Sequence, residues 1–150
     1  MTTIEQTVDV TVPVRTAYNQ WTQFEEFPQF MEGVDLVEQI TDTRTHWSTS
    51  IAGVKRDFDA EIVEQLPDER IAWQSLGEPH QAGVVSFHYV APEKTRVTLR
   101  MIYAPEGMAE KAGDKLHLIE RRVKSDLERF KSFIESRGTA SGGWRGEVRR

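Results

Sequence analysis

The apolar residues near the C-terminus constrain the fold more than any other feature of the chain. From 108 to 137 the basic and acidic residues are interrupted at steps of three and four by Leu116, Ile119, Val123, Leu127, Phe130 and Ile134. This spacing predicts a long helix with one apolar stripe, and Gly138 is the expected stop signal. Such a helix must pack its stripe on another apolar surface, which the rest of the chain has to supply.

The first 104 residues predict that surface as a set of strands. Val8, Val10 and Val12 alternate with polar residues, which predicts a half-buried strand over 4–12. Six further runs with strand character and turn signals between them follow at 34–40, 45–51, 55–66, 70–76, 83–91 and 95–104. Because the connections are short, neighbouring strands are expected to be antiparallel. The partner of the first strand is not fixed by the pattern.

Two short helices are expected between the first strand and the rest. A helix begins near Pro13 and buries Trp21 and Phe24, and the apolar spacing continues past Pro28 until Gly33. The order of elements predicts an α+β fold in which one face of a sheet meets one helix. A twisted sheet of seven strands cannot lie flat against a straight helix, so a cavity between them is expected.

Length and composition limit the domain organisation and the chemistry. The 150 residues suit a single domain, predicted over 1–138, and 139–150 are predicted to be a flexible tail carrying Trp144. Zero cysteines exclude disulfides, thiolate metal sites and cysteine nucleophiles, and a net charge of -5 argues against nucleic acid as a partner. With no apolar run of about 20 residues and no signal peptide, the expected location is the cytoplasm, without integral membrane association.

Metals and cofactors are not predicted. The four histidines, His46, His80, His88 and His117, are not at metal-ligand spacing from one another, and glycine-rich phosphate-binding motifs are absent. Four chemistry-bearing residues remain as catalytic candidates because they share the parity of the expected lining or flank the helix stripe: Arg56, Tyr89, Tyr103 and His117. Arg56 and Glu64 share the parity of Phe58, and for both the alternative is that they reach solvent.

Four stretches of sequence, in this order, resemble a known family. They are VPVRTAYNQWTQFEEFPQFM, AGVKRDFDAEIVEQLPDERIAWQS, GVVSFHYV followed by TRVTL, and the terminal GGWRG. Together with the order of elements they resemble the polyketide cyclase/dehydrase-like branch of the START-like (SRPBCC, Bet v 1-type) superfamily. The resemblance implies a helix-grip fold, in which a curved seven-stranded antiparallel sheet wraps around the long helix and holds a hydrophobic ligand. Only some members are aromatase/cyclases, so it does not choose a reaction.

One parity of each strand together with the helix stripe predicts the ligand-binding residues. They are Trp47, Phe58, Ile62, Trp73, Phe87, Tyr89, Leu99, Met101, Tyr103, Leu116, Ile119 and Val123. The many rings favour a planar or polycyclic ligand, while the alternative is that the same side chains fill a core.

The function expected from these patterns is the binding of a small lipophilic molecule as a carrier or sensor. The first alternative is a polyketide aromatase/cyclase or dehydratase in which the catalytic candidates assist proton transfer. The second is a ligand-free interaction module that uses a sheet edge or Trp144. The sequence leaves the oligomeric state open, a homo-oligomer included.

Overall fold

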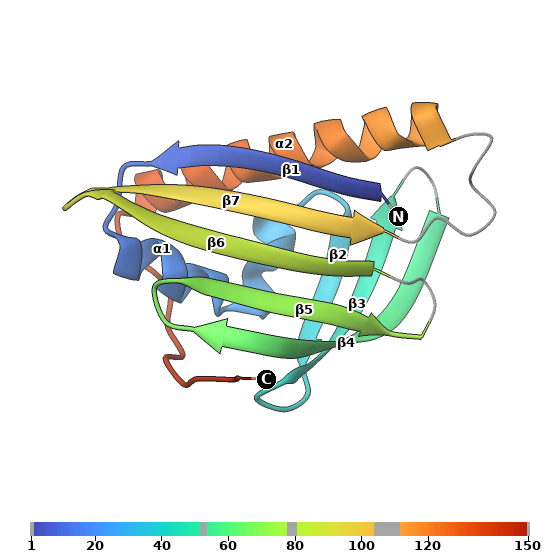
Figure 1. Cartoon of the computed structure of the whole chain (residues 1–150), viewed down its shortest axis with the longest axis horizontal. Coiled ribbons are helices and arrows are strands. Elements are labelled where there is room, and N and C mark those ends of the chain that lie inside the picture. Colours follow the sequence, from blue (N-terminus) through green and yellow to red (C-terminus); the bar gives the residue numbers. More distant parts are fainter. Residues whose placement is uncertain (1, 52–53, 78–80, 104–111, 150) are drawn as a thin grey trace.

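The computed structural model describes residues 2–51, 54–77, 81–103 and 112–149 and has the predicted α+β architecture (Figure 1). The elements are β1 (Thr2–Val10), α1 (Val14–Trp21), the 3₁₀ helix η1 (Phe24–Gln29), β2 (Val34–Gln39), β3 (Arg44–Ile51), β4 (Val54–Leu66), β5 (Arg70–Leu76), β6 (Gln81–Ala91), β7 (Lys94–Tyr103) and α2 (Ala112–Arg137). The expected start of the last helix, at Met108, lies outside the described residues.

All seven strands form one antiparallel sheet in the order β1-β7-β6-β5-β4-β3-β2. β1 pairs with β7, with Val8 opposite Val97, which is the long-range pairing that the sequence pattern left open. The curved sheet and α2 lie face to face, and α1 and η1 close one end of the space between them (Figure 1). This is the helix-grip arrangement that the sequence predicted.

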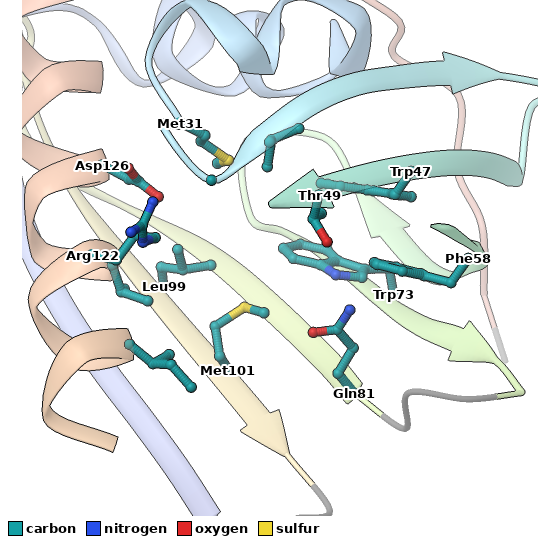
Figure 2. A pocket seen from close by; sticks show the side chains of 14 residues that line it. Met31, Trp47, Thr49, Phe58, Trp73, Gln81, Leu99, Met101, Arg122 and Asp126 are labelled. Carbon is teal, nitrogen blue, oxygen red and sulfur yellow. The ribbon is translucent and has the colours of Figure 1, made fainter. Parts of the chain in front are cut away.

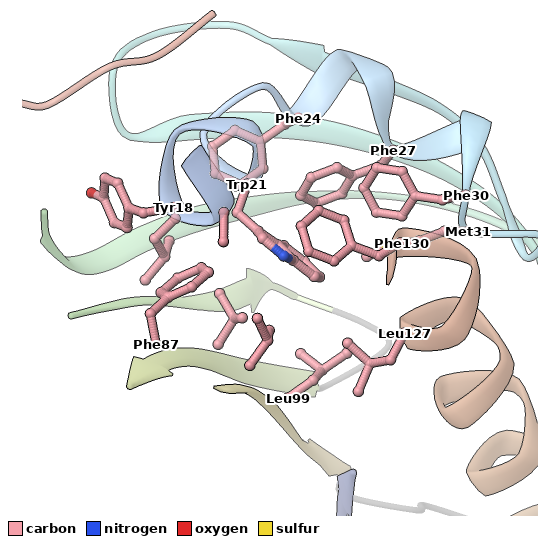
Figure 3. Close-up of a cluster of buried hydrophobic side chains, with 14 of the residues drawn as sticks. Tyr18, Trp21, Phe24, Phe27, Phe30, Met31, Phe87, Leu99, Leu127 and Phe130 are labelled. Atoms are coloured by element: carbon pink, nitrogen blue, oxygen red, sulfur yellow. The ribbon is translucent and has the colours of Figure 1, made fainter. Parts of the chain in front are cut away.

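Aromatic rings fill the end of the molecule near α1 and η1 (Figure 3). The indole of Trp21 lies with its centroid 5.1 Å from that of Phe27, 5.9 Å from Phe30 and 5.2 Å from Phe130 of α2. All four side chains are at most 1% exposed. Close packing of these rings fixes α2 against the short helices. Open space is therefore left toward the opposite end, where β6 begins and β7 ends.

A β-bulge in β4 changes which side chains point inward. Ile62 pairs with Trp73, but the next pair is Glu64 with Ala72, so one extra residue is inserted and the alternation shifts. Glu64 consequently points outward and binds Arg70, with Oε1 2.5 Å from Nε, while Gln65 is 1% exposed. The predicted shared parity of Glu64 and Phe58 is wrong for this reason.

The C-terminal segment after Gly138 contacts β4 and α1, and its predicted flexibility stays a prediction. The N–H of Gln65 donates to the carbonyl of Val148 at 2.8 Å, and the N–H of Val148 donates back at 2.9 Å. The guanidinium of Arg145 lies 2.8 Å from the carboxylate of Asp68 and 5.4 Å from the centre of the Tyr18 ring. β4 extends beyond the last β3 pair at Glu61, and the tail occupies the edge left open there.

Candidate functional site

A cavity lies between the inner face of the sheet and α2 (Figure 2). About 90 Å³ of it is open to the centres of water-sized molecules, which is room for several of them. The lining is mainly apolar and comes from the segment after η1, from the six strands β2 to β7 and from α2. It consists of Met31, Gly33, Val34, Trp47, Thr49, Phe58, Trp73, Gln81, Leu99, Met101, Ile119, Arg122, Val123 and Asp126.

The structure brings together most of the predicted apolar lining. Seven residues that the parity rule selected line the cavity, namely Trp47, Phe58, Trp73, Leu99, Met101, Ile119 and Val123. The rule works here because one face of each strand points toward the helix stripe. Contact of these residues with a ligand stays a prediction.

Three predicted residues lie elsewhere. Ile62 is buried in the core at 3% exposure, and Phe87 packs edge-on against the ring of Tyr18, with centroids 5.5 Å apart. Tyr89 is 65% exposed, because it lies near the end of β6 beside a bulge, in a hairpin that projects past the other strands (Figure 1). Tyr89 is therefore excluded both from the cavity lining and from any chemistry there.

The predicted catalytic residues do not gather at the cavity in the part of the chain that the structure describes. Arg56 is exposed, as the solvent alternative held, and Tyr89 is exposed as well. The side chains of Tyr103, Leu116 and His117 lie outside the described residues.

Aromatic rings form the sheet side of the cavity. Trp47 of β3 and Phe58 of β4 are stacked with an interplanar angle of 6° and centroids 6.1 Å apart. The Trp47 indole N–H donates to the hydroxyl of Thr45 at 2.7 Å, which fixes the ring orientation. Trp73 of β5 lies over Gly83 of β6. Flat apolar surfaces of this kind suit ring systems and extended hydrocarbon equally.

Two charged residues on α2 were missed by the sequence analysis. Arg122 and Asp126 are one helical turn apart, and both line the cavity (Figure 2). Their signal was their spacing of four along one flank of the apolar stripe, next to Val123 and Leu127. The same flank position normally faces solvent, so the spacing alone does not separate cavity residues from surface residues.

Asp126 is the perturbed titratable group of this site. One carboxylate oxygen accepts a hydrogen bond from the backbone N–H of Glu32 at 3.2 Å and lies 3.5 Å from the guanidinium of Arg129. Burial outweighs these contacts and the attraction of Arg122, and raises the pKa of Asp126 from its ordinary 3.8 to about 6. Its side chain is 12% exposed. A carboxyl with such a pKa can give or take a proton near neutral pH.

The family follows from a comparison with known proteins. Residues 10–131 match the family model described as polyketide cyclase / dehydrase and lipid transport. The chain belongs to this family. A protein of Streptomyces lincolnensis, described as an uncharacterized 17.2 kDa protein in the melC2-rnhH intergenic region, is 58% identical over 149 residues, covering 99% of each chain. The two proteins therefore align over nearly the whole of both sequences.

Solved structures show the same fold at low sequence identity. A Thermus thermophilus protein matches with a TM-score of 0.77 and 19% identity, covering 92% of this chain and 100% of its own. The Zhui aromatase/cyclase of a Streptomyces species matches with a TM-score of 0.76 and 19% identity, covering 95% and 99%. At this identity the likeness establishes the shared fold and leaves the chemistry open.

Two kinds of feature are absent from the part of the chain that the structure describes. Within the described ranges, no group of three or more His, Cys, Asp or Glu residues is placed to hold a metal ion. No helix in the described part of the chain is long and apolar enough to cross a membrane.

Proposed function

We propose that this protein binds a small hydrophobic molecule in the cavity under α2, as a carrier or sensor. The observation that carries the proposal is an apolar, aromatic-walled cavity with room for several water-sized molecules. Each 100 Å² of ligand apolar surface buried there contributes about 2.5 kcal/mol to binding, before the costs of association. A ligand with rings or a hydrocarbon chain would therefore gain most of its affinity from the wall that Trp73 and Met101 form.

The test is binding of the neutral fluorescent probe N-phenyl-1-naphthylamine. Met101 and Ile102 are adjacent on β7 and point to opposite faces of the sheet, so they give a matched pair. Met101→Trp is expected to fill the cavity and weaken probe binding at least ten-fold, whereas Ile102→Trp is expected to bind like the wild type. Circular dichroism and thermal unfolding confirm that both variants fold.

Two outcomes of this titration would contradict the proposal. One is equal loss of binding in both variants, which would place the probe outside the cavity. The other is an absence of probe binding by the wild type, which would favour the ligand-free interaction module.

The second candidate function is that of a polyketide aromatase/cyclase or dehydratase. It is favoured by the carboxyl of Asp126, whose pKa burial raises to about 6, in the same lining as Arg122. A largely buried acid or base beside an apolar chain is what proton transfer in a ring closure requires. In this proposal Asp126 moves the proton, and Arg122 stabilises negative charge on a carbonyl oxygen.

The cyclase activity is tested with a poly-β-ketone thioester, by comparing the ring products formed with and without the protein. A cyclase is expected to change the product distribution from that of the spontaneous reaction, and Asp126→Asn is expected to remove most of this effect. Products identical to those of the spontaneous reaction would contradict the enzyme candidate and leave the carrier proposal standing.

A further inference from the structure

Arg122 is a charged residue of the cavity lining that has no hydrogen-bond or ion-pair partner within the described residues. Arg122 lines the cavity and is half-buried (Figure 2). Within the described residues Arg122 makes no hydrogen bond and no ion pair, and it attracts Asp126 only over a longer range. A guanidinium carries five N–H donors, and removing them partly from water without acceptors is costly. These donors are therefore available to a molecule in the cavity.

Asp126 does not require Arg122 as its partner. It accepts the backbone N–H of Glu32 at 3.2 Å and lies 3.5 Å from Arg129, which in turn binds the Glu32 carboxylate at 3.0 Å. The Glu32 side chain is 65% exposed, so water screens much of its charge. Arg129 thus compensates Asp126 at the cavity wall, and the positive charge of Arg122 is left for a ligand.

The cavity has a polar side and an apolar side. Arg122 extends from α2, and Leu99 and Met101 of β7 lie between it and the indole of Trp73 on the far wall (Figure 2). A molecule that reaches both sides needs an acceptor at one end and a hydrocarbon or ring body at the other. Among oxygen acceptors, a carboxylate matches the planar fork of a guanidinium with two parallel hydrogen bonds.

We propose that the ligand is a lipophilic carboxylic acid, whose carboxylate is bound by Arg122 and whose apolar body lies on Met101 and Trp73. This inference rests on the proposed function, since it names the ligand class of the same cavity. It adds a head group and an orientation to what the apolar lining supports. Arg122 is then the residue that discriminates between an acid and a neutral lipophile of the same length.

The test compares decanoic acid with decan-1-ol, which share a chain and differ in the head group. Displacement of N-phenyl-1-naphthylamine measures both affinities at pH 7.5. The wild type is expected to bind decanoate at least ten-fold more tightly than decanol. Arg122→Gln is expected to weaken decanoate at least ten-fold and to leave decanol within about two-fold. Arg122→Lys keeps the charge but loses the planar fork, so its affinity for decanoate is expected to lie between those of the wild type and Arg122→Gln.

The matched control is Lys124→Gln, which removes one positive charge from an exposed position of the same helix. It is expected to change neither affinity by more than two-fold. Thermal unfolding of Arg122→Gln, and the bulkier Arg122→Met as a second variant, separates lost binding from lost folding.

The outcomes separate this inference from the proposed function. Equal affinity for acid and alcohol, or equal effects of Arg122→Gln and Lys124→Gln on decanoate, would overturn the carboxylate site while leaving a hydrophobe-binding protein. Failure of decanoate, decanol and N-phenyl-1-naphthylamine alike to bind the wild type would overturn both.

Discussion

Gly83 of β6 lies directly beneath the indole of Trp73 of β5. The two residues are opposite each other in the sheet, and a Cβ added to Gly83 would lie 2.4 Å from Trp73 Cζ2 and 2.6 Å from Cε2. Those ring atoms belong to a bulky side chain that lines the cavity, so the missing side chain of Gly83 lets the indole lie flat on the sheet. The shape of the cavity wall therefore depends on a glycine that is not itself one of the lining residues named above.

Gly83→Ala is accordingly expected to push the Trp73 ring into the cavity. The overpacking should lower the free energy of unfolding by about 1–3 kcal/mol, and the smaller cavity should weaken binding of N-phenyl-1-naphthylamine. Urea unfolding and probe titration measure the two effects. Trp73→Phe in the same chain removes the clash, so the double variant should be more stable than the sum of the two single changes predicts. Additive effects would show that the alanine does not act through Trp73.

The docked C-terminal segment gives a second prediction. Ending the chain after Gly138 removes the pairing of Val148 with Gln65 and the ion pair of Arg145 with Asp68. The amide of Gln65 is then expected to exchange hydrogen faster, because its acceptor, the Val148 carbonyl, is gone. Hydrogen exchange monitored by NMR measures this rate.

Single substitutions in the tail test which of its contacts contribute to stability. Arg145→Ala is expected to destabilise the protein by about 1 kcal/mol, since it removes a partly buried ion pair, a hydrogen bond to Asn19 and a contact with the Tyr18 ring. Arg149→Ala removes an exposed pair with Glu147 and should have little effect. Unchanged exchange at Gln65 in the truncated chain would mean that the tail is free in solution.

The fold was predictable because its signals are local. Alternation in the strands and the stripe from Ile119 to Ile134 are patterns of period two and about 3.6, and each needs only neighbouring residues to be recognised. The bulge after Ile62 breaks the alternation, and no glycine or proline marks it in the sequence. The pattern therefore predicted Glu64 as the inward residue, whereas Gln65 occupies that position. The contact between the tail and β4 could not be predicted, because the edge of β4 that the tail occupies is defined only by where its pairing with β3 ends.

The cavity was predictable in its apolar part and not in its charged part. Arg122, Lys124 and Asp126 all lie between stripe residues of α2. Lys124 is nevertheless exposed, while the other two line the cavity. Which flank of a helix is covered depends on what packs beside it, here the segment that brings the Glu32 amide to Asp126. Such tertiary packing leaves no mark in the periodicity of the helix itself.

The outer face of the sheet carries a histidine that titrates differently from a free one. Asp59 Oδ1 lies 2.6 Å from His46 Nδ1 across β3 and β4, and this hydrogen bond raises the pKa of His46 above its ordinary 6.5. NMR titration is expected to show that Asp59→Asn lowers the pKa of His46. Asp57→Asn should lower it less, because Asp57 acts only through its charge. Equal pKa values in Asp59→Asn and wild type would show that the pair does not form.

The linkage for His46 has a definite sign. A group with a raised folded-state pKa stabilises the fold below its unfolded value of 6.5, and this contribution disappears as the pH rises through the folded pKa. The difference in unfolding free energy between wild type and Asp59→Asn should therefore shrink on going from pH 6 to pH 9.

Asp126 gives the sharpest pH prediction, and its sign is the same as for His46 because both pKa values are raised in the folded protein. Because burial raises the pKa of Asp126 to about 6, the folded protein holds a proton between pH 3.8 and 6 that the unfolded chain has released. The contribution of this group to stability therefore falls as the pH rises through that window, and ionised Asp126 is a cost at pH 7.5. Asparagine keeps an oxygen for the Glu32 N–H but carries no charge.

Asp126→Asn is therefore expected to be more stable than the wild type at pH 7.5, by up to about 3 kcal/mol if the whole change in pKa is expressed. Well below pH 3.8 the carboxyl is protonated in both folded and unfolded wild type, so the gap should close as the pH falls. Urea unfolding of both proteins across this range measures it, and the paired comparison cancels His46 and the other titrating groups. A variant less stable at pH 7.5 would mean that attraction to Arg122 and Arg129 outweighs burial, with a pKa below 3.8.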